Sequence, residues 1–259
     1  MKKNANTRGK EKIHIVIGTK AQLIKMAPLM YLLEKKNIPY NFIFTGQHQK
    51  TIKDIRANFH IKEPDTVLHQ GKDITGIFQM LVWLLKISGK VIVNRRRYFP
   101  LKSKKQILLT HGDTFSTLLG AIMGKLAGIK VAHVESGLRS FNIFHPFPEE
   151  LTRIFTFQLS DIYFCPGDWA AENLKKYRGE KVNTEENTML DSLKFAKENF
   201  DHIKVNMPKE KYCIVSTHRF ENIFKKQQLE RICKQIMKIK NSKVLFILHP
   251  PTEIQLKKF

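Results

Sequence analysis

Short runs of apolar residues alternate along the chain with longer segments in which apolar residues recur every three or four positions. Short apolar runs bounded by Gly, Pro or Asp are typical of buried strands, and the three-to-four-residue period is typical of helices packed on one face. The predicted strands span 12–17, 42–45, 106–110, 131–134, 161–165, 212–216 and 243–248. The predicted helices span 23–33, 74–85, 115–127, 148–159, 190–200 and 229–239.

Predicted strands and helices follow one another with short connections. Parallel strands joined by helices build an open sheet covered on both faces, so the pattern predicts an α/β fold of the doubly wound, Rossmann-like type. We expect a first domain over 1–166, a linker over 167–186 and a second domain over 187–259. The second domain shows only two clear strands, whereas a doubly wound domain usually has about five or six, so we expect it to be incomplete.

Composition narrows the class of protein. With 259 residues, 42% of them apolar and 26% charged, the chain can bury a sizeable core. Three scattered cysteines predict neither a disulfide framework nor a zinc site, and they suit a reducing compartment, so we expect a cytoplasmic protein. No apolar run is long enough for a membrane span, and no apolar segment follows the basic N-terminus as it would in a secretory signal.

The chain is strongly basic, with 45 Lys and Arg against 23 Asp and Glu, or +22. Such a charge is compatible with nucleic acid, an anionic membrane surface or an anionic small substrate. Only ten of the cations are Arg, and the Lys residues are spread along the chain, which favours a small anionic ligand over nucleic acid. We interpret the basic run at 94–97 as a solvated loop, not a grip on phosphates or a membrane, and Phe78 and Trp83 as core residues, not a membrane anchor.

Polar residues that could carry chemistry follow the predicted strands. Ligands of open α/β sheets bind at the carboxyl ends of the strands. Neither GxGxxG nor GxxxxGK[ST] occurs, which disfavours a dinucleotide oxidoreductase or a P-loop NTPase, and no HExxH pattern predicts a metal site. Carboxylates beside cations and a histidine suit acid–base chemistry on a phosphorylated or nucleotide substrate. This set comprises Asp113, Glu135, Glu149, Glu150, Lys20, Lys25, Arg139, Arg219 and His218.

These residues lie in motifs that resemble those of the non-hydrolysing UDP-N-acetylglucosamine 2-epimerases. The resemblance covers about 12–250, and its motifs follow the order and spacing of the family. They are Gly18-Thr19-Lys20 with Lys25 and Pro28, Thr45-Gly46-Gln47-His48, His111-Gly112-Asp113-Thr114, His133-Val134-Glu135-Ser136-Gly137-Leu138-Arg139, Pro148-Glu149-Glu150 with Arg153, Asn187-Thr188 with Asp191, and Thr217-His218-Arg219 with Glu221-Asn222.

The resemblance implies two Rossmann-like domains of the glycosyltransferase-B type, with the active site in the cleft between them. It implies inversion of C2 between UDP-N-acetylglucosamine and UDP-N-acetylmannosamine, through elimination and re-addition of UDP, for cell-surface polysaccharide and without a redox cofactor or metal. The implied partners are a UDP-sugar and a second copy in a homodimer, with neither nucleic acid nor a membrane span. The implied catalytic residues are Asp113, Glu135, Glu149 and His218, and the implied substrate-binding residues are Lys20, Lys25, His48, Arg139 and Arg219.

The sequence departs from the family pattern in three places. Lys20 stands where the family has Arg, which keeps the charge but loses the two-pronged contact to phosphate, and Glu186 stands where the family has Gly. The later Asp-Ser-Gly-Gly segment, which holds uridine and diphosphate in the family, has no counterpart, as expected for a fragment or a truncated product with impaired activity. A non-catalytic remnant that binds a nucleotide sugar or a partner, and a hydrolysing epimerase, therefore stay as alternatives.

Overall fold

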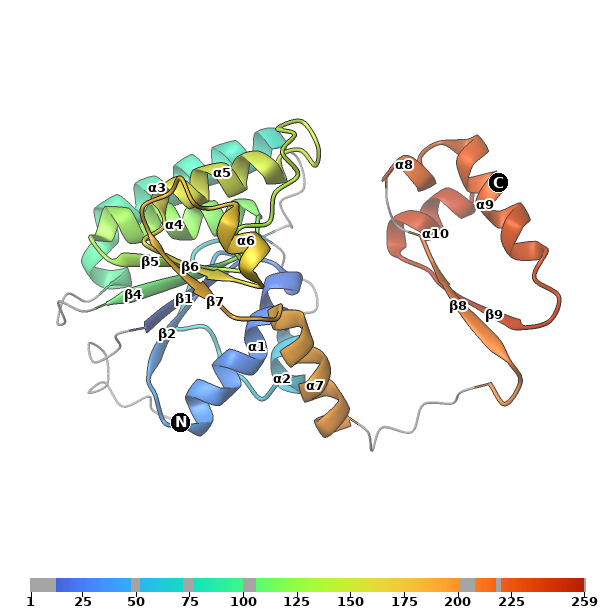
Figure 1. The fold of residues 1–259 in the computed structure, drawn as a ribbon, viewed down its shortest axis with the longest axis horizontal. Helices are drawn as coiled ribbons and strands as arrows, with labels where there is room; N and C mark the ends of the chain where they lie inside the picture. Colours follow the sequence, from blue (N-terminus) through green and yellow to red (C-terminus); the bar gives the residue numbers. More distant parts are fainter. Residues whose placement is uncertain are drawn as a thin grey trace. The chain divides into compact units, whose positions relative to one another are not determined.

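The computed structural model describes residues 13–47, 52–71, 77–99, 106–200, 208–217 and 220–258. The chain forms two compact units, Met1–Phe200 and Asp201–Phe259 (Figure 1). Each unit is considered by itself below. Within the described residues, no helix is both long and apolar enough to cross a membrane.

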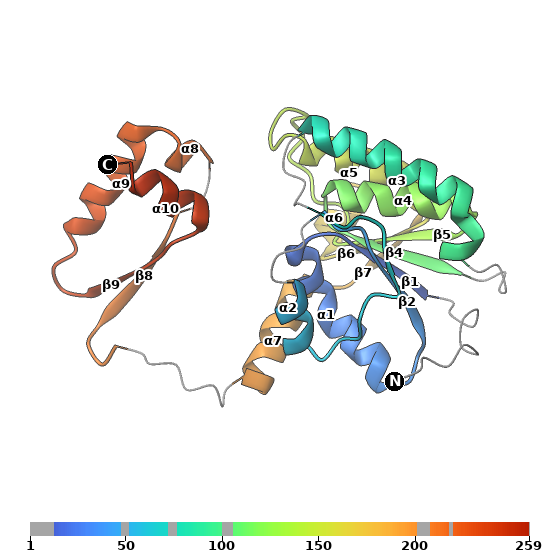
Figure 2. The same ribbon diagram turned by 180° about the vertical axis from the view of Figure 1, so that it is seen from behind.

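The first unit is built on a seven-stranded parallel sheet in the order β3-β2-β1-β4-β5-β6-β7. The strands are β1 (Ile13–Ile17), β2 (Tyr40–Phe44), β3 (Thr66–Val67), β4 (Ile107–His111), β5 (Lys130–Val134), β6 (Ile162–Cys165) and β7 (Glu180–Asn183). The helices are α1 (Lys20–Lys35), α2 (Ile52–Asn58), α3 (Ile77–Tyr98), α4 (Phe115–Ala127), α5 (Glu149–Leu159), α6 (Asp168–Glu172) and α7 (Thr188–Phe200). Helices α3, α4 and α5 cover one face, whereas α1, α2 and α7 cover the other (Figures 1 and 2). The predicted doubly wound α/β fold is confirmed.

The two faces of the sheet pack into two separate cores. Because side chains alternate along a strand, Ile15 and Ile17 of β1 join the core under α1, whereas Val16 joins the core under α3 and α4. Both faces are therefore apolar along the central strands, as a sheet covered by helices on both sides requires.

The strand order of the sheet reverses at the neighbouring strands β1 and β4. Strands β2 and β3 are added on one side of β1, and β4 then pairs with β1 on the other side. Such a switch point leaves a crevice at the carboxyl ends of the two strands, where ligands of this fold class bind. The turn after β1 requires glycine, because a Cβ at Gly18 would lie 1.9 Å from Ser116 Oγ and 2.1 Å from Thr45 Oγ1.

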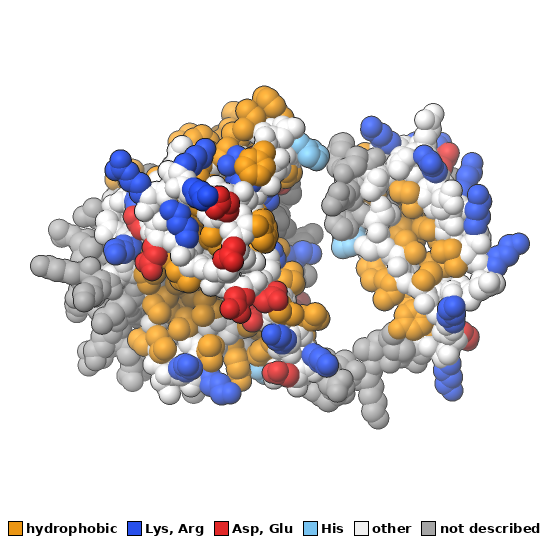
Figure 3. Space-filling view, in the orientation of Figure 1, with side chains coloured by type: hydrophobic (Ala, Val, Ile, Leu, Met, Phe, Trp, Pro, Cys, Tyr) orange, Lys and Arg blue, Asp and Glu red, His pale blue; other side chains and the backbone are white. Residues whose placement is uncertain are grey.

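The second unit contains a two-stranded parallel sheet in its described part. Strands β8 (Tyr212–Ser216) and β9 (Lys243–Ile247) pair in register, and α8 (Phe220–Ile223), α9 (Lys226–Met237) and α10 (Pro250–Leu256) accompany them. Ile214 and Ile247 are 59% and 51% exposed. Hydrophobic side chains are visible over this part of the unit (Figure 3).

The structure corrects four expectations. Residues 167–186 do not form a linker, because they contain α6 and β7, and β7 pairs with β6. The boundary between the units falls at 200/201, since α7 packs on α1, where Ser192 Oγ donates to the Ile24 carbonyl at 2.7 Å. The basic run at 94–97 is not a loop, because it begins at a kink in α3 at Asn94 (φ −108°, ψ 22°) and continues into the helical end of that element. Trp83 is buried as predicted, whereas Phe78 is 78% exposed and not a core residue.

Candidate functional site

A cavity of about 330 Å³ lies at the switch point of the first unit. It is formed by the turn after β1, the turn after β4 and the start of α5. Three of the predicted site residues, Lys20, Asp113 and Glu149, line it together. We call it the switch-point pocket; its lining is Thr19, Lys20, Ala21, Gln47, Met80, Asp113, Thr114, Phe115, Pro148 and Glu149.

Three helices begin at the switch-point pocket. Thr19 caps α1 and Thr114 caps α4, each by accepting a hydrogen bond from the backbone three residues on, and α5 begins at Glu149. The Gln22 side chain links the first turn of α1 to the first turn of α4, because its Nε2 donates to the His111 carbonyl at 2.7 Å and to Thr117 Oγ1 at 3.0 Å. Helix N-termini carry partial positive charge, so together with Lys20 they favour an anionic ligand.

Asp113 is held by an arginine that sequence reasoning had not assigned to the site. Arg153 Nη2 donates to Asp113 Oδ2 at 2.6 Å, and the Thr152 hydroxyl donates to the Asp113 carbonyl. Arg153 Nη1 also lies 3.1 Å from Glu150 Oε2. The arginine therefore links the turn after β4 to the first turn of α5 and neutralises the Asp113 carboxylate.

Arg139 forms an ion pair with a buried carboxylate of the protein. Its Nε lies 2.5 Å from Oε1 of Glu150, a carboxylate with no exposed surface. Burial raises the pKa of Glu150, but hydrogen bonds from Arg139, the Ser140 backbone and Arg153 outweigh burial and lower it overall. A buried charge paired in this way positions the loop that precedes α5.

Glu149 differs from Asp113 and Glu135 in the contacts that its carboxylate makes. It is the first residue of α5 and lines the switch-point pocket. Its Oε2 is buried and has no hydrogen-bond partner among the described residues. Asp113 and Glu135 are both paired with cations. Glu149 therefore has an oxygen available to accept a proton.

Glu135 follows β5 and is held from two elements. Lys25 Nζ of α1 lies 2.6 and 2.7 Å from its two oxygens, and His111 Nε2 at the end of β4 lies 3.1 Å from Oε2. Burial raises the pKa of Glu135, but the hydrogen bonds and charges of His111 and Lys25 outweigh it and hold the pKa at about 2. The backbone of Glu135 has φ of 60°, a conformation that non-glycine residues rarely adopt.

His133 supports the turn that carries Asp113. Its Nε2 lies 2.7 Å from the Gly112 carbonyl, and Ser136 Oγ lies 2.9 Å from its Nδ1. Burial lowers the pKa of His133 to about 4, against the opposing effect of the Gly112 hydrogen bond. His133 is therefore neutral at pH 7, with Nε2 donating to the carbonyl and Nδ1 accepting from the serine.

The structure brings the predicted residues together in two groups. Lys20, Asp113 and Glu149 share the pocket, and Lys25 pairs with Glu135. His48, His218 and Arg219 lie outside the described residues. His111 and Arg153 lie within the sequence motifs, but no role was predicted for either of them. Their position beside the assigned carboxylates in those motifs was the available signal.

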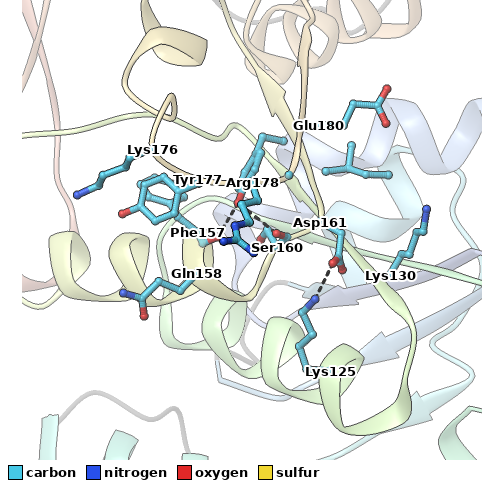
Figure 4. Close-up of a pocket in the computed structure, with 13 residues that line it drawn as sticks. Lys125, Lys130, Phe157, Gln158, Ser160, Asp161, Lys176, Tyr177, Arg178 and Glu180 are labelled. Carbon is cyan, nitrogen blue, oxygen red and sulfur yellow. Dashed lines mark hydrogen bonds and ion pairs between the residues drawn. The ribbon is translucent and has the colours of Figure 1, made fainter.

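A larger hollow of about 610 Å³ lies at the opposite edge of the sheet (Figure 4). It is formed at the amino ends of β5, β6 and β7, with the Lys125–Asp161 ion pair of 2.6 Å at its side. None of the predicted site residues lines it. Since ligands of this fold class bind at the carboxyl ends of the strands, we assign the functional site to the switch-point pocket.

The fold and the pocket define a Rossmann-like α/β protein with paired acids and bases at a site suited to an anionic, nucleotide-type ligand. A family model described as UDP-N-acetylglucosamine 2-epimerase matches residues 31–258. The chain belongs to this family.

Individual relatives agree with the family model. A UDP-N-acetylglucosamine 2-epimerase of Methanocaldococcus jannaschii is 31% identical, over 96% of this chain and 68% of the relative. The solved structure of a UDP-GlcNAc 2-epimerase from the same organism, in complex with UDP-GlcNAc and UDP, is 29% identical with a TM-score of 0.70, over 95% of this chain and 68% of that one. The Neisseria meningitidis enzyme shares the fold, with 24% identity and a TM-score of 0.78, over 95% of this chain and 68% of that one. The glycosyltransferase-B type of fold is thereby confirmed, and the chain spans about two thirds of the length of these relatives.

Proposed function

We propose that this chain carries the acid–base half of a non-hydrolysing UDP-N-acetylglucosamine 2-epimerase, which interconverts UDP-N-acetylglucosamine and UDP-N-acetylmannosamine for cell-surface polysaccharide. The observation that carries the proposal is the switch-point pocket, where Lys20, Asp113 and Glu149 meet in a member of this family. A related structure is in complex with UDP-GlcNAc and UDP, which supports a UDP-sugar as the substrate here.

The proposed reaction needs a base and a stabilised diphosphate. A base removes the C2 proton, the electrons of that bond form the C1–C2 double bond, and the C1–O bond breaks with its electron pair leaving on UDP. UDP then adds back to C1 while a proton is returned to the opposite face of C2. Lys20 and the three helix N-termini at the pocket suit the diphosphate, and the inversion at C2 suits a site with more than one carboxylate.

Within this reaction we assign the C2 base to Glu149. Its Oε2 is buried at the pocket and has no hydrogen-bond partner among the described residues. By contrast, Asp113 forms an ion pair with Arg153. Glu135 forms ion pairs with Lys25 and His111. Asp113 and Glu135 remain in the proposed acid–base set. His218 completes that set, and Lys25, His48, Arg139 and Arg219 remain the proposed substrate-binding residues.

The test is exchange of the C2 hydrogen of UDP-N-acetylglucosamine with deuterium from D₂O, followed by proton NMR. We expect Glu149→Gln to lower the exchange rate at least about a hundredfold, the usual scale for a general base, while binding of UDP measured by calorimetry changes little. The control is Glu172→Gln, because Glu172 is an exposed acid of α6 that pairs with Lys175. Unchanged exchange in Glu149→Gln would exclude Glu149 as the base.

The same spectra separate the alternatives. Appearance of UDP-N-acetylmannosamine supports the non-hydrolysing reaction, whereas accumulation of UDP with free N-acetylmannosamine indicates a hydrolysing epimerase. Binding of the nucleotide sugar with neither exchange nor product indicates a non-catalytic remnant. Each outcome is read from sugar and phosphorus signals in one sample.

We further propose that two copies of the chain associate through α3, in the cytoplasm. The outer side of α3 carries large apolar residues that are 47–83% exposed, and the inner side buries Trp83, Ile87 and Val91. An apolar stripe on both sides is typical of a helix that is buried on both sides. The exposed stripe comprises Phe78, Leu81, Leu85, Ile92 and Val93. Free thiols at Cys165, Cys213 and Cys233 support a reducing compartment.

A further inference from the structure

His111, the last residue of β4, lies between Glu135 and the first residue of α7. Its Nε2 is 3.1 Å from Glu135 Oε2 and also 3.1 Å from Thr188 Oγ1. The imidazole is almost fully buried, with 3% of its side chain exposed. Its Nδ1 is buried as well and has no hydrogen-bond partner among the described residues.

The contacts of Glu135 require a proton on His111 Nε2. An ionised carboxylate only accepts hydrogen bonds, and Lys25 already donates to both of its oxygens. A lone pair on His111 Nε2 facing Oε2 would be repelled, so Nε2 must carry the proton and donate it to the carboxylate. Thr188 Oγ1, at 3.1 Å from Nε2, can share the Nε2 proton as a second acceptor.

Helix α7 contacts the surroundings of both residues that hold Glu135, which are His111 and Lys25. Thr188 begins this helix and contacts His111, and one turn later Ser192 Oγ donates to the carbonyl of Ile24, the residue before Lys25, at 2.7 Å. The backbone of Glu135 is left-handed, with φ of 60°, so the residue departs from the extended conformation of β5. Its position therefore depends on contacts from neighbouring elements.

We propose that His111 is a positioning residue, which donates from Nε2 to Glu135 and, with Thr188 of α7, holds this carboxylate in the orientation required for the acid–base chemistry. The proposal rests on the proposed function for its catalytic consequence, whereas the hydrogen bond itself is a property of the protein alone. His111 does not line the switch-point pocket, and its Nε2 contacts Glu135, so we infer that it acts through the glutamate.

The first experiment needs no activity. Long-range proton–nitrogen NMR of the histidine rings, with the His111 signals assigned by their loss in His111→Gln, is expected to show a proton on Nε2. Glu135→Ala removes the acceptor and is expected to shift the Nε2 signals of His111. A proton on Nδ1 alone, or His111 signals indifferent to Glu135→Ala, would overturn the proposal.

The second experiment uses the C2 exchange assay. Glutamine places an amide N–H close to the position of Nε2, so His111→Gln is expected to retain exchange within about threefold. His111→Leu removes the donor and is expected to lower the maximal exchange rate tenfold or more, with the KM for UDP-N-acetylglucosamine changed less than about threefold, since a misplaced group slows the reaction without removing a binding contact. Circular dichroism checks that both variants fold.

A double-mutant cycle tests the contribution of α7. Thr188→Val is expected to lower exchange in the unaltered chain and to have no further effect in His111→Leu, because the two residues act through one hydrogen bond. Equal losses in His111→Gln and His111→Leu, or additive effects of His111→Leu and Thr188→Val, would contradict positioning. If the unaltered chain shows no exchange at all, the proposed function fails, while the NMR experiment still decides the role of His111 in holding Glu135.

Discussion

Glu135 keeps its charge although its side chain is buried, because Lys25 and His111 supply donors on both of its oxygens. Its pKa of about 2 lies below the ordinary value of 4.5. A carboxyl with a lowered pKa in the folded state stabilises the fold fully above its unfolded value, and this contribution is lost as the pH falls towards the folded value. The relevant window for Glu135 is thus between about pH 4.5 and pH 2.

We predict that Glu135→Gln costs stability at pH 6 and that this cost shrinks as the pH falls to about 2.5. The reason is that protonated glutamate and glutamine offer similar groups to Lys25 and His111. The free energy of unfolding of the first unit can be measured in urea by tryptophan fluorescence, since Trp83 and Trp169 both lie in this unit.

Glu172→Gln is the matched control for this titration. Its carboxylate is 58% exposed, so the difference from the unaltered chain should stay small at every pH. His133, whose pKa is lowered to about 4, adds a separate acid-induced loss between about pH 6.5 and pH 4, which cancels between the unaltered chain and Glu172→Gln. A cost of Glu135→Gln that is independent of pH would show that the glutamate is not held as a charge.

Sequence motifs identified these residues but not their partners. Lys25 and Glu135 were both predicted as site residues, yet 110 positions separate them, and their pairing follows from α1 lying against the ends of β4 and β5. Arg139 was predicted to bind substrate because it follows a strand-end glutamate in a motif. Its contact with buried Glu150 arises from the return of the chain at α5, which residue spacing does not reveal.

At the scale of elements, prediction succeeded where caps and periodicity agree. Helix α4 has the predicted bounds of 115–127, because Thr114 caps its start and Gly128 ends it in the left-handed conformation. Strand β7 was missed, since its sequence Glu-Lys-Val-Asn is polar at the edge of the sheet. Helix α3 was predicted to end at 85 but extends to Tyr98, with a kink at Asn94, because apolar residues on both of its sides blur the helical period.

The exposed stripe of α3 gives a prediction for assembly. Leu85 is 73% exposed in the middle of the stripe, so a charge there would have to be buried in a dimer that packs through α3. We expect the unaltered chain to sediment as a dimer and Leu85→Glu to sediment as a monomer in analytical ultracentrifugation.

Leu193→Glu is the control for the assembly, because Leu193 of α7 is exposed to a similar degree, 65%. It should leave the dimer intact. A monomeric unaltered chain, or a dimer that persists in Leu85→Glu, would contradict packing through α3. Sedimentation of the chain with anionic vesicles, abolished by Leu85→Glu, would instead identify the stripe as a membrane contact.

At the scale of the whole molecule, the sequence predicted two units but not where they divide. The predicted boundary near 166 followed the Pro-Gly turn after β6, where a strand ends and the composition changes. The chain then adds β7 to the same sheet and places α7 on α1, so the first unit extends to Phe200. Such a return to an earlier element depends on contacts far apart in sequence.

The net charge of +22 is the remaining property of the whole molecule, and it bears on what the chain binds. Lys and Arg side chains are scattered over the visible surface of both units and do not gather in one stripe (Figure 3). Scattered cations attract a polyanion without a fixed register, so any binding to duplex DNA should come from phosphate contacts alone.

We therefore predict weak binding of duplex DNA that is independent of its sequence and falls steeply between about 50 and 200 mM salt, because each phosphate contact releases a counterion. Fluorescence anisotropy with two labelled duplexes of unrelated sequence measures both properties. UDP binding should survive the same salt increase better, since Lys20 and three helix N-termini lie together at one pocket and make few, close contacts. Binding of one duplex sequence that persists at 200 mM salt would contradict a small anionic ligand as the reason for the charge.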